Sequence, residues 1–200
     1  MAEVLKIDTP LPVGNLGARN TGLWGAWALI VTEGSLFAYL LVTYAYLALA
    51  SGQAWPPEGP PRLLVPGVNT VILLASSGCV VMAERWLRQD RRGLSLAGLS
   101  LAVVLGVIFV AVQMHEWADK GYGPSAHLYG SLYFTITGFH MAHVAVGALM
   151  LACVAAWTAM GRVTSAGPAP LVIAGMYWHF VDIVWLVIFS VLYLMPHLHG

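Results

Sequence analysis

Five long runs of apolar residues divide this sequence, and they restrict its fold more than any other feature. The runs cover residues 23–49, 66–87, 94–115, 131–158 and 171–195. Each is about as long as the roughly 20 residues that a helix needs to cross a bilayer. No run alternates polar and apolar residues with a period of two, which excludes the strands of a membrane barrel. The sequence therefore predicts an all-α integral membrane protein, a bundle of five transmembrane helices with satisfied backbone hydrogen bonds.

The charge content agrees with a surface that faces lipid. Only 9% of the 200 residues are charged, against about a quarter in a soluble domain, and the mean hydropathy is +0.77. The formal net charge of zero offers no basic surface for nucleic acid, so no nucleic-acid partner is expected. The connections at 51–61, 88–93, 118–125 and 161–170 are short and polar or rich in Pro and Gly, which is typical of turns. Residues 1–200 are therefore expected to form a single membrane domain.

The basic residues lie mainly on one side of the predicted bundle. One side carries Lys6, Arg19, Arg85, Arg88, Arg91, Arg92 and Arg162, and the other carries Arg62 and Lys120. Because cytoplasmic loops are enriched in Lys and Arg, this asymmetry predicts a cytoplasmic N-terminus and a periplasmic C-terminus. The first 22 residues lack an apolar core after a basic start, so no cleaved signal peptide is expected.

A few ionisable side chains occur inside the apolar runs, where a charge costs about 2.5–3.5 kcal/mol on insertion scales. They are Glu33 in the first run, His140 and His143 in the fourth, and His179 and Asp182 in the fifth. Residues three apart share a helix face, which applies to each of the last two pairs. Buried polar groups are nearly always paired, so we expect His–Asp or His–Glu hydrogen bonds between helices.

Other positions in the runs suggest packing or solvation. Gly34 with Ala38 and Gly138 with Ala142 have the four-residue spacing of small residues at close helix contacts. A different set, Gln113, His115 and Glu116, ends the third run close to an interface, where water is expected to solvate it. Cys79 and Cys153 lie in separate runs without metal-ligand spacing, so neither a disulfide nor a zinc site is expected.

Alternative functions for the same polar residues remain open at this point. A b-type haem needs ligands on opposite faces, which His143 and His179 could supply from two helices but His140 and His143 could not. A metal centre could use His140, His143, His179 and Asp182, although the Glu-x-x-His spacing of diiron sites is absent. A proton relay through Glu33 and Asp182 needs a polar chain to an interface. A transporter usually has helices interrupted by Gly or Pro at mid-membrane, whereas the prolines here lie at run ends or in loops.

Several short motifs occur in the order that is typical of one family. The fifth run contains YWHFVDIVWL at 177–186, the fourth contains TGFHMAHV at 137–144, and the first contains TEGSLF at 32–37. A WPP loop at 55–57, Asn69-Thr70, and Gln113 with Glu116 follow the same order. Over about residues 20–195 the chain resembles subunit III of the haem-copper oxidases, such as cytochrome c oxidase, in its short five-helix bacterial form.

The resemblance implies a non-catalytic subunit of a proton-pumping terminal oxidase in a bacterial plasma membrane. Haem and copper would belong to subunits I and II, and this chain would pack on subunit I, hold phospholipid and support turnover, with no cofactor or metal of its own. Glu33 would be the buried glutamate near the lipid cleft, and His140, His143, His179 and Asp182 would have structural roles. Alternatives are subunit III of a quinol oxidase, an accessory subunit of a nitric oxide reductase and, more remotely, a haem-b membrane anchor.

Two departures from the family pattern concern helix packing. Longer members have seven helices, and the two that precede the glutamate helix have no counterpart in this sequence, although they form one wall of the lipid cleft. Met141-Ala142 stands where the family usually has Gly-Leu. The larger Met141 side chain is therefore expected to alter a close helix contact without affecting the histidines.

Overall fold

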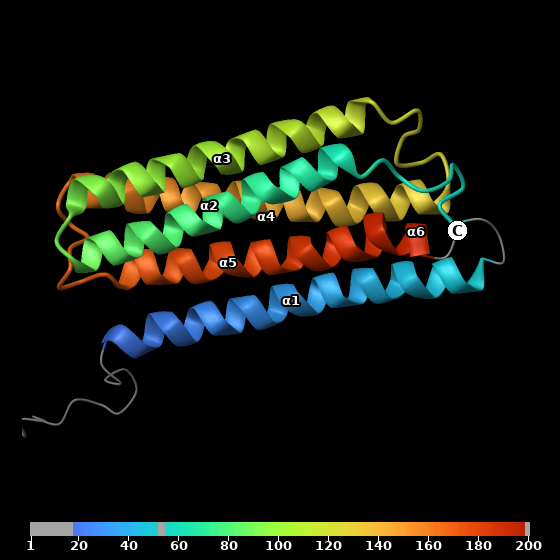
Figure 1. Ribbon diagram of the computed structural model, residues 1–200. Helices are drawn as coiled ribbons and strands as arrows, with labels where there is room; N and C mark the ends of the chain where they lie inside the picture. The colour runs from blue at the N-terminus through green and yellow to red at the C-terminus, as the bar shows by residue number, and fades with distance from the viewer. Residues whose placement is uncertain (1–17, 52–54, 199–200) are drawn as a thin grey trace, which may run out of the picture.

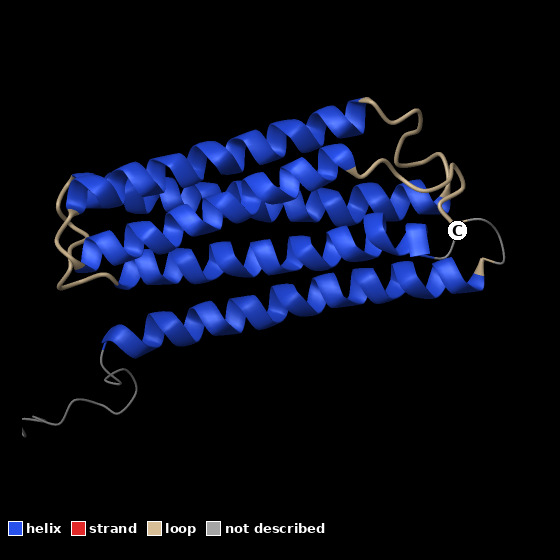
Figure 2. Ribbon diagram, viewed as in Figure 1, coloured by secondary structure: helices blue, strands red, loops and turns tan. Residues whose placement is uncertain are grey.

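The computed structural model describes residues 18–51 and 55–198 and consists of five long helices (Figures 1 and 2). These are α1 (Ala18–Ala50), α2 (Leu64–Arg88), α3 (Arg92–Ala118), α4 (Leu128–Ala159) and α5 (Ala169–Phe189), and a π-helical turn η1 (Ser190–Leu194) joins α5 to the short α6 (Met195–Leu198). Within the described ranges, all five long segments are long and apolar enough to cross a membrane. The predicted all-α fold with five membrane helices is confirmed; α1 to α4 extend a few residues beyond their apolar runs, whereas the end of the fifth run forms η1 and the start of α6.

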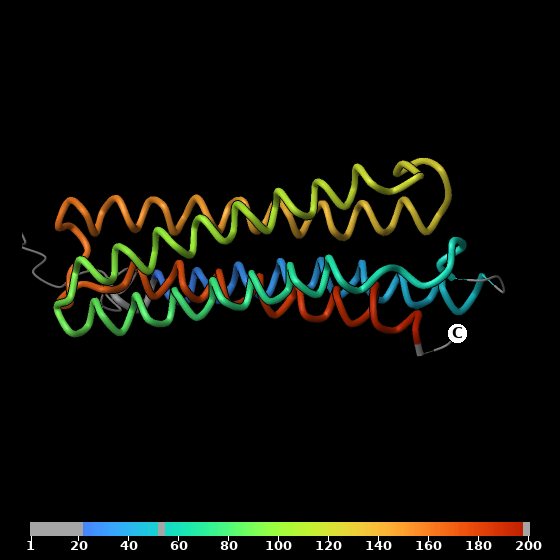
Figure 3. Tube along the Cα trace, turned by 45° about the horizontal axis from the view of Figure 1, so that its top comes forward, coloured from blue at the N-terminus to red at the C-terminus, as the bar shows by residue number. Residues whose placement is uncertain are grey.

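The helices form two layers, with α3 and α4 in one and α2, α5 and α1 in the other (Figure 3). The helix α5 is central because it packs against α1, α2 and α4. In the most apolar 18-residue stretch of the α5 span, 56% of the residues are buried inside the bundle, whereas in the equivalent stretch of α1 only 6% are buried. The first helix is therefore peripheral, and most of its circumference is open to lipid or to another protein.

The two ends of the bundle are distinct. The start of α1, the α2–α3 turn and the α4–α5 loop lie at one end, which we call the amino end, and the α1–α2 and α3–α4 connections lie at the other, the carboxyl end (Figure 1). At the amino end the Arg92 guanidinium donates to the carbonyl oxygens of Thr158, at 2.5 Å, and Ala159. These bonds satisfy carbonyls at the last turn of α4, which have no partner within the helix.

A single indole ring joins four helices in the core. Trp178 of α5 is fully buried, and its Nε1 donates to Ser76 Oγ of α2 at 3.0 Å. On its other sides the ring packs against Gly106 of α3 and Gly147 of α4, where a Cβ atom would lie 2.6 Å and 2.8 Å from ring carbons. Only glycine therefore lets α3 and α4 approach this ring.

A narrow seam attaches α1 to α4 and α5. Its half-buried or buried positions include residues 26, 30, 33, 37, 40, 44 and 47, which alternate in steps of four and three. This is the spacing of helices that pack nearly parallel with interlocking side chains. Near the carboxyl end, the buried Tyr44 ring meets Trp55 at 5.6 Å and Tyr129 at 6.1 Å between ring centres. Tyr122 in the α3–α4 loop extends this aromatic cluster, and burial raises its pKa to about 12, so it stays neutral.

Candidate functional site

An ionisable pair crosses the seam between α1 and α4. Nε2 of His143 lies 3.0 Å from Glu33 Oε2, and His143 Nδ1 lies 2.6 Å from the carbonyl oxygen of Phe139. A carbonyl oxygen can only accept, so Nδ1 carries a proton. The bond from Nε2 to the carboxyl group then contains one further proton, held either by the histidine or by the glutamate. In both arrangements the pair has no net charge, which suits a position within a membrane.

The environment of this pair differs on its two sides. Phe37, which is 2% exposed, covers the inner side with its ring centre 5.0 Å from that of His143 and 6.4 Å from that of His140. The Glu33 side chain keeps 32% of its surface exposed, compared with 12% for His143. The carboxyl group therefore lies at the outer edge of the α1–α4 contact, and the imidazole lies farther in.

His140 makes a separate connection, from α4 to α5. Its side chain is fully buried, and Nε2 lies 3.2 Å from the carbonyl oxygen of Val181. Because that oxygen can only accept, Nε2 is the protonated nitrogen of the ring. The rings of Phe109 and Trp185 pack against the imidazole at 5.6 Å and 4.9 Å between centres. His140 and His143 share one helix face, but they bind two different helices.

On α5, His179 and Asp182 differ in their contacts. His179 Nδ1 bonds Ser77 Oγ of α2 at 2.5 Å. Asp182 is 4% exposed, and neither of its carboxyl oxygens has a hydrogen-bond partner among the described residues. The nearby polar group is again the Ser77 hydroxyl. Of the expected His–Asp or His–Glu bonds between helices, the His–Glu kind is formed by His143 and Glu33, whereas His179 is directed toward Ser77 of α2.

The geometry gives no support to a metal centre or a relay. In the ranges 18–51 and 55–198, no three His, Cys, Asp or Glu side chains are grouped so that they could hold a metal ion. His143 bonds to α1 and His179 bonds to α2, so the two imidazoles contact different neighbouring helices. The hydroxyls of Thr32, Ser35 and Thr43 donate to carbonyls of their own helix, so they do not connect Glu33 to an interface.

A second polar cluster, at the carboxyl end, was not anticipated. Glu116 Oε1 accepts hydrogen bonds from the hydroxyls of Tyr133 at 3.0 Å and Tyr193 at 3.1 Å, and Lys120 Nζ lies 3.5 Å from the same oxygen. Gln113 is fully buried beside it. The expectation that water solvates these residues is therefore wrong for Gln113, whereas the Glu116 side chain keeps 12% of its surface exposed.

Solvation does hold for the third member of that predicted set. His115 is 76% exposed and pairs with the equally exposed Asp119 at 3.2 Å. The spacing of Gln113, Glu116 and Lys120 along one face of α3 is a signal for the buried cluster. The two tyrosines that complete it come from distant segments, so the sequence alone could not identify them.

The fold and these contacts define a class of protein: a multi-pass helical membrane protein in which the histidines within the membrane runs bond to neighbouring helices. Comparison with known sequences identifies the family. A sequence model of cytochrome c oxidase subunit III matches residues 16–196. This chain therefore belongs to that family, is subunit III of a haem-copper oxidase, and has other oxidase subunits as its partners.

Individual relatives agree with this assignment. Cytochrome c oxidase subunit 3 of Synechocystis is 35% identical over 188 residues, which cover 91% of this chain and 79% of the relative. Cytochrome bo(3) ubiquinol oxidase subunit 3 of Pseudomonas aeruginosa is 32% identical over 178 residues, covering 86% and 84%. Cytochrome c oxidase subunit 3 of Myxine glutinosa is 33% identical over 177 residues, covering 85% and 68%.

Proposed function

We propose that this chain is a non-catalytic, structural subunit of a proton-pumping terminal oxidase and that it packs directly on subunit I. The observation that carries the proposal is the use of the intramembrane histidines. Each of His140, His143 and His179 bonds a protein group on a neighbouring helix. Side chains used in this way hold helices together. Haem and copper then belong to subunits I and II, which together reduce O2 to water.

The proposed electron donor is cytochrome c. Its support is the name cytochrome c oxidase subunit 3, carried by the relatives from Synechocystis and Thermostichus vulcanus. A quinol oxidase is the second candidate, because the Pseudomonas aeruginosa relative is named as a ubiquinol oxidase subunit. A copper-binding subunit II in the purified complex would favour cytochrome c, and its absence would favour quinol.

The proposed location is a bacterial plasma membrane, with the amino end of the bundle in the cytoplasm and all 200 residues in one membrane domain. Support comes from the arginines at the amino end, which are Arg85, Arg88, Arg91, Arg92 and Arg162. At the carboxyl end are Arg62 and Lys120. Lys6 and the side chain of Arg19 lie outside the described residues. Under the positive-inside rule this distribution favours a periplasmic carboxyl end.

The proposed role of the Glu33–His143 pair is to hold α1 against α4 and to keep an ordered phospholipid beside the exposed edge of Glu33. His140, His179 and Asp182 are proposed to be structural residues of the α2, α4 and α5 contacts. Glu33→Ala is expected to lower lipid retention or the stability of turnover and to leave the haem spectrum unchanged. Glu33→Gln is the matched control, since its amide can still donate to His143 Nε2.

The test of the whole proposal is a spectrum of two samples. The complex is purified through this chain from native membranes in mild detergent, its subunits are identified, and its reduced-minus-oxidised spectrum is recorded. The same spectrum is then recorded for the isolated chain. We expect oxidase haem and subunit I in the complex and a colourless isolated chain. Haem absorbance in the isolated chain would refute the non-catalytic role.

A further inference from the structure

Four arginines surround the α2–α3 turn, but only two of them have partners. Arg88 forms an ion pair with Glu84 at 2.6 Å, and Arg92 donates to the carbonyl oxygens of Thr158 and Ala159. Arg85 and Arg91 are exposed, and their guanidinium groups have no hydrogen bond or ion pair with the described part of the chain. Two unneutralised positive charges thus lie at the membrane interface of the amino end.

An apolar groove begins beside these two arginines. It runs between α2 and α3, has a volume of about 370 Å³, and its lining includes Ala75, Gly78, Met82, Trp86, Ala97 and Leu101. The groove is shallow because α2 and α3 approach closely at Gly98, where a Cβ atom would lie 3.1 Å from Ala83 Cβ. Small side chains on both helices therefore leave a channel on the outer surface.

Helical spacing places the free arginines at the mouth of this groove. Arg85 follows Gly78 and Met82 at intervals of seven and three residues, so it continues the α2 stripe that lines the groove. Arg91 precedes Leu94, another lining residue, by three positions and lies at the start of α3. Trp86 lines the same end, as tryptophans do at the level of lipid headgroups.

We propose that the α2–α3 groove binds an anionic phospholipid, with an acyl chain along the groove and the headgroup phosphate against Arg85 and Arg91. Basic pockets between membrane helices at the cytoplasmic side are suited to anionic headgroups. This site lies on a different face from the Glu33–His143 pair. The inference goes beyond the proposed structural role there and does not depend on it.

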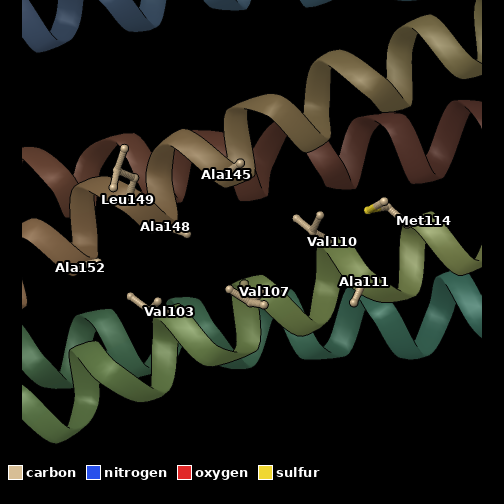
Figure 4. Close-up of a pocket in the computed structure, with 10 residues that line it drawn as sticks. Val103, Val107, Val110, Ala111, Met114, Ala145, Ala148, Leu149 and Ala152 are labelled. Carbon is tan, nitrogen blue, oxygen red and sulfur yellow. The ribbon is translucent and has the colours of Figure 1, made fainter.

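A second apolar groove differs from the α2–α3 groove because it has no charged residue in its lining. The groove between α3 and α4 has a volume of about 450 Å³ and is lined by aliphatic residues, alanine and Met114 (Figure 4). Val103, Val107 and Ala145 border it, and no charged residue is part of its lining. It has space for an alkyl chain but no group that would bind a phosphate. It therefore provides a matched control for the α2–α3 groove.

The experiment measures lipid retention by the whole oxidase complex. Complexes are equilibrated in nanodiscs with equal amounts of dioleoylphosphatidylglycerol and dioleoylphosphatidylcholine, and native mass spectrometry counts the lipids that stay on this chain. The variant Arg85→Gln/Arg91→Gln is expected to lower the preference for phosphatidylglycerol roughly 30-fold, or about 2 kcal/mol at 1.4 kcal/mol per tenfold change. High salt should weaken the same preference in the unmodified complex, because exposed charges are screened.

Two leucine variants separate the grooves. Ala97→Leu fills the α2–α3 groove and is expected to reduce retention of both lipids, whereas Ala145→Leu in the α3–α4 groove should leave the phosphatidylglycerol preference unchanged. The proposal is overturned if the double arginine variant retains phosphatidylglycerol like the unmodified complex, or if Ala145→Leu removes it. Loss of a co-purifying subunit instead of lipid would also overturn it, because the face would then be a protein interface.

Discussion

A methyl group added beneath the Trp178 ring should disturb the bundle by an amount that follows from its packing. A Cβ atom on Gly106 would lie 2.6 Å from Trp178 Cη2. Carbon atoms in contact prefer about 3.5–4.0 Å, so the added methyl overlaps the ring by roughly 1 Å. The ring cannot move away without a loss, because it is fully buried and its Nε1 is bonded to Ser76 Oγ.

The size of the effect is the difference between two terms. Overpacking a core costs about 1–3 kcal/mol, and replacing a helical glycine by alanine recovers about 1 kcal/mol. We therefore expect Gly106→Ala to lower the free energy of unfolding by up to about 2 kcal/mol. For a chain of this size that is a fall in Tm of up to about 8 °C. Gly147→Ala should behave similarly, since its Cβ would lie 2.8 Å from Trp178 Cε3.

The assay is thermal denaturation followed by circular dichroism in one detergent. Gly78→Ala is the control, because a Cβ atom there would meet nothing within 4 Å, and its Tm should stay constant or rise. Trp178→Phe removes Cη2, so Gly106→Ala should cost less in that background than in the native chain. Equal Tm values for Gly106→Ala and Gly78→Ala, or full additivity with Trp178→Phe, would refute the overlap argument.

Three other contacts give further predictions. Glu33→Ala should reduce disulfide cross-linking between cysteines introduced on facing positions of α1 and α4, and unchanged cross-linking would show that the His143 bond does not hold α1. Arg92→Gln should speed hydrogen exchange in the last turn of α4, because the native Arg92 side chain binds carbonyls there. Arg91→Gln is the control and should leave this exchange unchanged. Equal effects of the two variants would contradict the capping role of Arg92. Tyr193→Phe removes one of the donors to Glu116 and should lower the free energy of unfolding by about 1 kcal/mol, which the same denaturation assay measures.

The membrane helices could be predicted from the sequence because each apolar run alone determines its own structure. The Glu33–His143 bond was partly predictable for a related reason: an ionisable residue inside a membrane needs a partner, and few are available. The sequence did not specify which histidine would pair with which carboxylate. His179 bonds Ser77, and Asp182 is left without a hydrogen bond in the described structure, because helix rotation decides these contacts.

Close helix packing was harder to predict than helix formation. Gly138 does approach Trp117, with a Cβ distance of 3.2 Å, but Gly34 makes only an ordinary contact with Phe180 at 3.6 Å. The tightest glycine contacts are at Gly106, which follows Ala102 at the four-residue spacing of small-residue motifs, and at Gly147, which has no small residue at that spacing. They depend on a tryptophan from another helix, and that relation is not visible in the sequence around either glycine.

The peripheral position of α1 has a consequence for how the protein is made. Glu33 and its partner His143 are separated by 110 positions, and α1 packs mainly against α5 and α4 rather than α2. At about 5–20 residues per second, His143 is synthesised roughly 5–20 seconds after Glu33. During that interval α1 resides in the bilayer with its carboxyl group unpaired, while α2 and α3 can already associate. Although α1 precedes α2 and α3 in the chain, it is thus packed after them, and a chain that stops before α4 leaves Glu33 without His143.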